Sequence, residues 1–143
     1  MMSRRIALAA AAIAGVFAIA GCGSMASATP GDMSATLSGA SEVPPTSSPG
    51  TGMATVNLSG NSLTWTVTYS GLTGPVKAGH FHGPAEAGSN AGVVLPFTGS
   101  LESPVKGSAT LTDAQIADLK AGKWYINLHT AANPGGEVRG QVK

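Results

Sequence analysis

The clearest strand signal in the chain is Leu63-Thr64-Trp65-Thr66-Val67-Thr68-Tyr69. Apolar side chains occupy every second position and threonines lie between them, which is the period of a strand with one buried face and one wet face. Ala54, Val56 and Leu58 indicate a preceding strand, and Gly60-Asn61 is a typical hairpin turn between the two. These residues predict antiparallel β-structure.

The same pattern continues outward from this hairpin. Weaker strand candidates lie at residues 93–97 and 108–111, and clusters of Gly, Pro, Asn and Ser separate the apolar runs. One helix is expected over Asp113–Lys120, where Thr112 and Gln115 are placed for a capping box and Gly122 ends the turn. We therefore predict an all-β fold, an antiparallel Greek-key-like β-sandwich or barrel with one short helix.

The N-terminus has the pattern of an export signal. Arg4 and Arg5 precede an apolar run over residues 6–20, which is short for a bilayer span but typical of a signal peptide. The run ends in Ile19-Ala20-Gly21-Cys22, which resembles a bacterial lipobox whose cysteine is lipidated before cleavage. We expect a lipoprotein signal peptide at 1–21, a flexible tether at 22–32 lipidated on Cys22, and a domain at 33–143. The alternative is an ordinary secretory signal with a leftover thiol.

The charge balance of the mature chain excludes some partners. Residues 1–21 hold two of the eight Lys and Arg and none of the seven Asp and Glu, so their removal leaves a net charge of −1. No basic footprint for nucleic acid is present. Acyl chains on Cys22, rather than surface charge, would hold the protein at the bacterial membrane, outside the cytoplasm. Gly23 and Ser24 are similar to an outer-membrane sorting pattern in a Gram-negative host.

The chain has three histidines, and strand alternation predicts that all of them share the face away from the apolar core. Within residues 79–82, His80 and His82 point to one side and Phe81 to the other. Within residues 124–129 the buried set is Trp124, Ile126 and Leu128, so His129 projects to the opposite side beside Tyr125 and Asn127.

A His-x-His pair on a strand with one remote histidine suits a transition metal, because imidazole binds copper and zinc well. With Cys22 modified, no thiol remains as a competing ligand. A thiol-free site outside the cytoplasm favours copper, and zinc is the weaker candidate. The alternative is that the histidines only pin loops to strands, with Glu137 and Asn127 as hydrogen-bond partners.

Alternation over residues 136–142 buries Val138 and Val142 and turns Glu137, Arg139 and Gln141 to the histidine side, under loops at 83–84 and 133–136. Arg139 either steers an anion toward the metal or pairs with a carboxylate such as Glu42. Glu137 either orients a histidine, as outer-sphere partners of metals do, or is a solvated strand residue. Asn127 is the second outer-sphere candidate. Met33 and Met53 are either soft ligands or filler.

Four motifs resemble the CHRD domain, named for chordin. They are residues 38–45 (Ser-Gly-Ala-Ser-Glu-Val-Pro-Pro), 78–84 (Ala-Gly-His-Phe-His-Gly-Pro), 125–130 (Tyr-Ile-Asn-Leu-His-Thr) and 133–141 (Asn-Pro-Gly-Gly-Glu-Val-Arg-Gly-Gln), in this order. The resemblance implies a β-sandwich module of secreted bacterial proteins and of an extracellular signalling antagonist. It does not by itself imply an activity.

The order of His-x-His, remote His and C-terminal Arg is also similar to the copper half of copper/zinc superoxide dismutases. That likeness implies that His80, His82 and His129 hold copper and that Arg139 is a catalytic residue attracting superoxide. The chain lacks a fourth histidine, a zinc subloop and a disulfide pair. We therefore expect an anchored domain with a mononuclear copper site and treat dismutase-like chemistry as a hypothesis. The alternatives are metal delivery without turnover, and a non-catalytic envelope interaction or structural module without metal.

Overall fold

The structure is a computed structural model that describes residues 31–143, so the expected signal peptide, Cys22 and residues 23–30 of the expected tether lie outside the described residues. The described part is all-β with one short α-helix, as the alternation predicts. Its elements are β1 (Asp32–Ser38), the 3-10 turn η1 (Gly39–Ser41), β2 (Thr51–Ser59), β3 (Ser62–Ser70), β4 (Val76–His82), β5 (Val93–Pro96), β6 (Val105–Thr110), α1 (Asp113–Lys120), β7 (Tyr125–Thr130) and β8 (Val138–Gln141).

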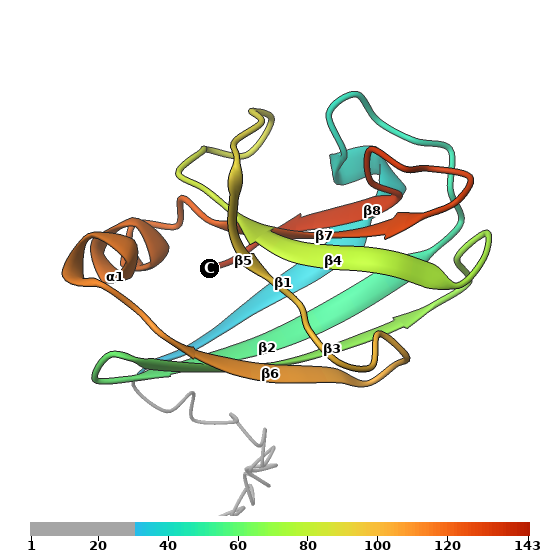
Figure 1. Cartoon of the computed structure of the whole chain (residues 1–143). Helices are drawn as coiled ribbons and strands as arrows, with labels where there is room; N and C mark the ends of the chain where they lie inside the picture. Colours follow the sequence, from blue (N-terminus) through green and yellow to red (C-terminus); the bar gives the residue numbers. More distant parts are fainter. Residues whose placement is uncertain (1–30) are drawn as a thin grey trace, which may run out of the picture.

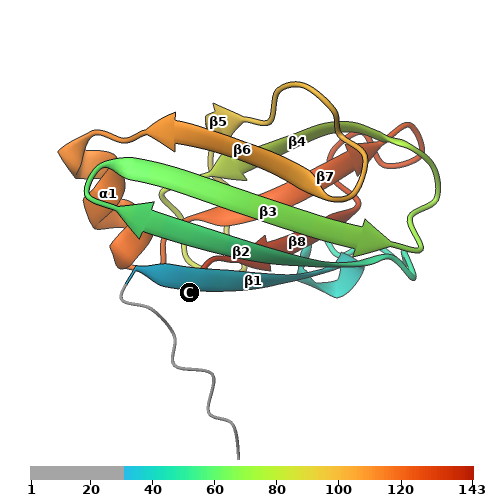
Figure 2. The same cartoon turned by 90° about the horizontal axis from the view of Figure 1, so that it is seen from below.

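The strands form one curled antiparallel sheet in the order β5-β4-β7-β8-β1-β2-β3-β6. The link between β8 and β1 is a single residue pair, Ser38 with Arg139, whereas β2 and β3 pair along nine residues each. The sheet folds over at this weak link. As Figures 1 and 2 show, β4, β5, β7 and β8 make one layer and β1, β2, β3 and β6 make the other.

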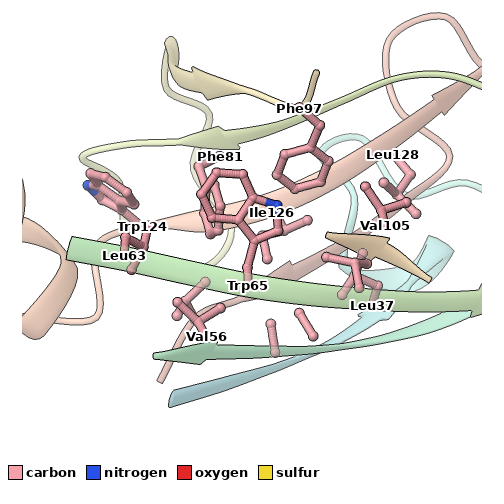
Figure 3. Packing of buried hydrophobic residues seen from close by; sticks show 14 of the residues in the cluster. Leu37, Val56, Leu63, Trp65, Phe81, Phe97, Val105, Trp124, Ile126 and Leu128 are labelled. Atoms are coloured by element: carbon pink, nitrogen blue, oxygen red, sulfur yellow. The ribbon is translucent and has the colours of Figure 1, made fainter. Parts of the chain in front are cut away.

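The hydrophobic core fills the space between the layers (Figure 3). Trp65 of β3 packs edge-on against Phe81 of β4, with ring centroids 5.1 Å apart, and lies stacked against Phe97 at 5.6 Å. Gly79 makes room for this cluster, because a Cβ at that position would lie 2.5 Å from Cδ2 of Phe97. Leu63, Trp65 and Val67 are buried, as their alternation predicts.

The local predictions are confirmed at the hairpin and the helix. Gly60 takes a positive φ of 61° in the turn between β2 and β3. Thr112 caps α1, with its hydroxyl accepting from the Gln115 amide at 3.3 Å and its own amide donating to Gln115 Oε1 at 2.9 Å. Figure 1 shows α1 at one end of the sheet. Some strand bounds differ from those expected. In particular, β1 begins at Asp32, inside the expected tether, and β6 begins at Val105 rather than at 108.

No helix among residues 31–143 is both long enough and apolar enough to cross a membrane.

Candidate metal centre

Strands β4 and β7 bring the three histidines together on the outer face of their layer. The two strands pair antiparallel, with His80 opposite Asn127, His82 opposite Tyr125, and His129 opposite Ala78. Phe81, between the two β4 histidines, is fully buried in the core. The histidines therefore lie on the side away from the aliphatic interior, as alternation predicts, and all three are half-buried.

One nitrogen from each histidine lies within 4.8 Å of one nitrogen from each of the others. The shortest pair is His80 Nδ1 and His129 Nε2, at 3.1 Å. Two nitrogens bound to one ion at about 2.0–2.1 Å are roughly 3.0 Å apart at a right angle and at most about 4.2 Å apart in line. The closest pair already has the spacing of neighbouring ligands, whereas the 4.8 Å limit for the set exceeds that range, so binding one ion requires the rings to move closer together.

Backbone carbonyls select which nitrogen of two histidines faces the centre. His129 Nδ1 lies 2.9 Å from the carbonyl oxygen of Pro134, and His82 Nδ1 lies 2.9 Å from that of Ala91. A carbonyl only accepts, so both Nδ1 atoms carry the proton and both neutral rings present Nε2 as a lone pair. His82 Nε2 is buried and has no hydrogen-bond partner. A buried imidazole nitrogen that no hydrogen bond occupies is available to bind a metal ion.

The electrostatics of the site keep two of the rings neutral. Burial lowers the pKa of His80, and the nearby His129 and His82 lower it further. Burial also lowers the pKa of His82. Hydrogen bonding acts in the opposite direction, from Asn127 on the pKa of His80 and from the Ala91 carbonyl and then Asn127 on the pKa of His82. Since a metal binds only the neutral imidazole, low pKa values leave these nitrogens available near neutral pH.

The model of the CHRD domain matches residues 33–142, which is most of the chain. The chain belongs to the CHRD domain family. No curated protein and no solved structure matched the chain. Two of the four motifs noted in the sequence, 78–84 and 125–130, supply the histidines, and a third, 133–141, lies beside them, with Pro134 bonded to His129 and β8 paired with β7.

Tyr125 of the CHRD domain braces His82. The two rings are stacked at 4.8 Å with an interplanar angle of 2°. The Tyr125 hydroxyl donates to the carbonyl oxygen of Ala91 at 3.1 Å and accepts from the Ala91 amide at 3.0 Å. The same carbonyl receives the His82 Nδ1 proton. The β4–β5 loop thus fixes His82 and Tyr125 through one residue, Ala91, which sequence reasoning missed because its contribution is entirely backbone.

Arg139 lies on the predicted face but is not exposed. Its guanidinium carbon is 3.5 Å from the centroid of the Tyr125 ring, Nη1 donates to Asn90 Oδ1 at 2.8 Å, and Nη2 donates to the Ser89 carbonyl. The side chain is 2% exposed. Arg139 thus lies on the predicted side of β8, and the β4–β5 loop, which includes the expected loop at 83–84, covers it. Any attraction of an anion by Arg139 is long-range.

Glu137 is also covered and does not hydrogen-bond to a histidine nitrogen. Its Oε1 accepts from Ser48 Oγ at 2.8 Å and from the Thr73 amide at 2.9 Å. Burial acts to raise the pKa of Glu137, but hydrogen bonds from Thr130, Ser48 and Thr73 outweigh it and hold the pKa below its ordinary value. The solvated alternative is wrong, since Glu137 is fully buried. It ties the β1–β2 and β3–β4 connections to β8.

Glu42 lies near Arg139 without the simple pairing considered from sequence. Burial raises the pKa of Glu42 to about 7, and the positive charge of Arg139 counteracts only part of that effect. Of the two methionines, Met33 packs against the core and Met53 is 57% exposed on β2. Neither belongs to the β4–β7 layer that carries the histidines, which leaves the three imidazoles as the described residues that cluster for a metal.

Proposed function

We propose that this CHRD domain binds one copper ion through His80, His82 and His129. The observation that supports this proposal is the convergence of three ring nitrogens within 4.8 Å, including the unpartnered buried Nε2 of His82. His129 would bind through Nε2, since Pro134 occupies its Nδ1, and His80 through Nδ1, the atom that faces His129. An all-imidazole donor set suits Cu(II) or Zn(II), and copper is favoured by the affinity order.

The site is proposed to work outside the cytoplasm, with the protein anchored to the bacterial membrane by lipid on Cys22. The support for this part is the lipobox-like sequence 19–22, which lies outside the described residues. A Cys22→Ser variant of the full chain tests it. We expect the wild type to partition into the detergent phase and to label with radioactive palmitate, and the variant to do neither. Equal partitioning of both proteins contradicts lipidation.

The metal test is the copper content of the purified chain. After loading with Cu(II) and removal of excess, elemental analysis is expected to give about one copper per chain. His80→Ala, His82→Ala and His129→Ala are each expected to lower the affinity about tenfold or more, because each removes a ligand. Met53→Ala is the matched control, since it removes an exposed soft side chain away from the site. Wild-type levels of copper in all three histidine variants would contradict the proposal.

Thermal unfolding of the loaded and the chelated protein distinguishes a metal site from a purely structural role of the histidines. If the histidines only brace loops, chelator treatment leaves the melting temperature of the loaded protein unchanged, and His129→Ala destabilises the metal-free protein through loss of the Pro134 contact. If they bind copper, the loaded protein melts higher than the chelated one, because a ligand that binds only the folded state stabilises it.

We extend the proposal to one-electron chemistry on a small anion such as superoxide, as copper cycles between two oxidation states. It is supported by the half-buried histidines, which leave the site reachable from solvent. The buried Arg139 would contribute only long-range positive charge. A superoxide assay of the loaded protein is expected to exceed the rate of free copper, and Arg139→Gln to lower the rate and its salt dependence. A rate no faster than free copper contradicts dismutation and leaves metal binding or delivery.

A further inference from the structure

We propose that Asn127 is the fourth ligand of the metal, bound through its side-chain oxygen Oδ1. This inference rests on the proposed three-histidine site and goes beyond it, since it turns an all-imidazole centre into one with three nitrogens and one oxygen. It also replaces the expectation that Asn127 only orients a histidine from the outer sphere.

Asn127 lies at the centre of the histidine face. It pairs with His80 of β4 on one side and with Arg139 of β8 on the other, and it precedes His129 by two residues on β7. Its side chain lies near the rings of His80 and His82. Asn127 is 4% exposed and so is more deeply buried than the half-buried histidines. An ion placed among the three rings therefore meets the Asn127 amide from below.

The distance from Asn127 Oδ1 to His129 Nε2 is 3.0 Å, nearly equal to the 3.1 Å between His80 Nδ1 and His129 Nε2. Bonds of about 2.0–2.2 Å meeting near a right angle place two ligand atoms roughly 3.0 Å apart. Asn127 Oδ1 therefore lies nearly as far from His129 Nε2 as the proposed ligand atom of His80 does. Imidazole nitrogens with a carbonyl-type oxygen also form a recognised donor set for Cu(II).

The hydrogen-bond roles support a cation at this point. His129 Nδ1 gives its proton to Pro134, so Nε2 of the neutral ring is a lone pair. Asn127 Oδ1 is an acceptor as well, and no proton lies between these two atoms in that tautomer. Two lone pairs facing each other at 3.0 Å repel in the absence of a shared positive charge. A metal ion bound to both atoms removes that repulsion.

Glu42 explains why the amide oxygen, rather than the amide nitrogen, faces the histidines. A Cβ at Gly136 would lie 2.5 Å from Glu42 Oε1 and 2.8 Å from Asn127 Nδ2, so the carboxyl group and the amide nitrogen share the space that this glycine leaves open. Glu42 Oε1 is buried and has no hydrogen-bond partner. The two atoms form no hydrogen bond, but an acceptor oxygen attracts the donor Nδ2 more than it would attract Oδ1, so the amide nitrogen lies on the Glu42 side and Oδ1 faces His129.

A fourth ligand from the protein changes what the centre does. It closes a position that an open three-histidine site would leave to water, and its oxygen favours Cu(II) over Cu(I). A small anion would then have to enter a fifth position or displace the amide. We therefore expect the wild-type site to hold Cu(II) more tightly, and to exchange external ligands less readily, than a three-histidine site.

The test is electron paramagnetic resonance of the full-length chain loaded with Cu(II), combined with a competition titration for affinity. Asn127→Ala is expected to change the g and hyperfine values and to weaken Cu(II) binding about tenfold or more. Asn127→Asp restores an oxygen at the same place and is expected to restore the affinity. Asn57→Ala is the matched control, because it removes an amide from β2, in the layer that carries no histidine.

The outcomes separate this inference from the proposed function. One copper in the wild type, with a changed spectrum in Asn127→Ala and recovered affinity in Asn127→Asp, supports ligation by Oδ1. One copper in the wild type, with an unchanged spectrum and affinity in Asn127→Ala, overturns the fourth ligand and leaves the three-histidine site intact. Absence of copper from the wild type overturns both. Circular dichroism of the metal-free variants confirms that each one folds.

Discussion

The two layers of this CHRD domain use the same alternation of side chains but treat their outer faces differently. On β2 and β3 the outward-facing Thr55, Thr64 and Thr68 are exposed, and Thr66 is half-buried. On β7 both faces are covered: Ile126 points into the core and is fully buried, while Asn127 points outward and is 4% exposed. Among residues 31–143, the buried polar and charged side chains are Glu42, Asn127, Thr130, Glu137 and Arg139, all in β7, β8 or the segments next to η1 and β8.

This difference shows that alternation decides on which side of a strand a residue lies, and loops decide whether that side meets water. The β4–β5 loop contacts His82, Tyr125 and Arg139 through residues 89–91, and the β7–β8 loop contacts His129 through Pro134. Within residues 31–143, no comparable set of loop hydrogen bonds covers the exposed threonines. Burying polar groups costs free energy unless each finds a partner. The covered face, meaning the outer face of β4, β7 and β8, therefore depends on specific hydrogen-bond partners.

The largest effect expected on the covered face comes from Glu137→Ala. It removes the acceptor of the Ser48 hydroxyl and the Thr73 amide and leaves both without that partner. Hydrogen bonds to a buried charge are worth roughly 1.5–3 kcal/mol each, so we expect a loss of about 3 kcal/mol at pH 7, measured by urea unfolding. The exposed Glu102→Ala is the control.

Glu137 also has a pH signature. Its pKa is held below the ordinary 4.5, so its stabilising contribution is present above that pH and is lost as the pH falls through the lower, folded-state value. The wild type should therefore lose stability in acid more steeply than Glu137→Gln. Parallel stability curves for the two proteins below pH 4.5 would show that the charge of Glu137 does not stabilise the fold.

Arg139→Ala is expected to destabilise the domain by about 2 kcal/mol, because it removes a guanidinium stacked on Tyr125 and a hydrogen bond to Asn90. Arg139→Lys keeps the charge but not the planar fork, so we expect it to recover less than half of the loss. Urea unfolding of the three proteins measures this. Full recovery of stability in Arg139→Lys would mean that the charge of Arg139, rather than its stacking on Tyr125, stabilises the fold.

Glu42→Gln is expected to change stability in the opposite direction. The folded-state pKa of Glu42 is raised to about 7 from 4.5, so the wild type loses stability as the pH rises through that window. The neutral glutamine avoids this loss. We expect the variant to be more stable than the wild type by about 2 kcal/mol at pH 8 and similar to it at pH 4, as measured by urea unfolding. A variant that is less stable at pH 8 would show that the carboxylate has a partner that stabilises its charge.

The fold was predictable because its decisive signals are local. The alternation at 63–69, the Gly60 turn and the Thr112 cap depend on neighbours within a few residues, and all three are confirmed. The histidine face was predictable for a related reason, since a period of two fixes the side of a strand without knowledge of its neighbours. Adjacency of β4 and β7 was not predictable in this way, because pairing between distant strands is set by the tertiary fold.

The burial of Arg139 and Glu137 could not be predicted from the sequence. Both lie on the predicted side of β8, but the groups that cover or bind them are the backbone of Ser89 and Thr73 and the side chains of Ser48 and Asn90, up to 89 residues away. Loop backbone leaves no residue-type pattern in a sequence. Composition gave a partial signal, because the described domain has a single arginine, which lies near two loops, 83–92 and 131–137, that are rich in glycine, proline and asparagine.

The smallest effect is expected on the open face, from Thr64→Ala. Thr64 is exposed on β3, where it pairs with Asn57 of β2 and Ser108 of β6, and the variant retains the backbone ladder. Exposed substitutions away from special features change stability by within about 0.5 kcal/mol, and we expect that here. Asn127→Ala in the metal-free protein, also a polar residue replaced on an outer face, should cost several times more, because the side chain of Asn127 is itself 4% exposed and its removal leaves a buried space. Urea unfolding measures the loss of stability in each variant. Equal losses in the two variants would mean that the polar contacts of the histidine layer do not stabilise the fold, although loops cover them.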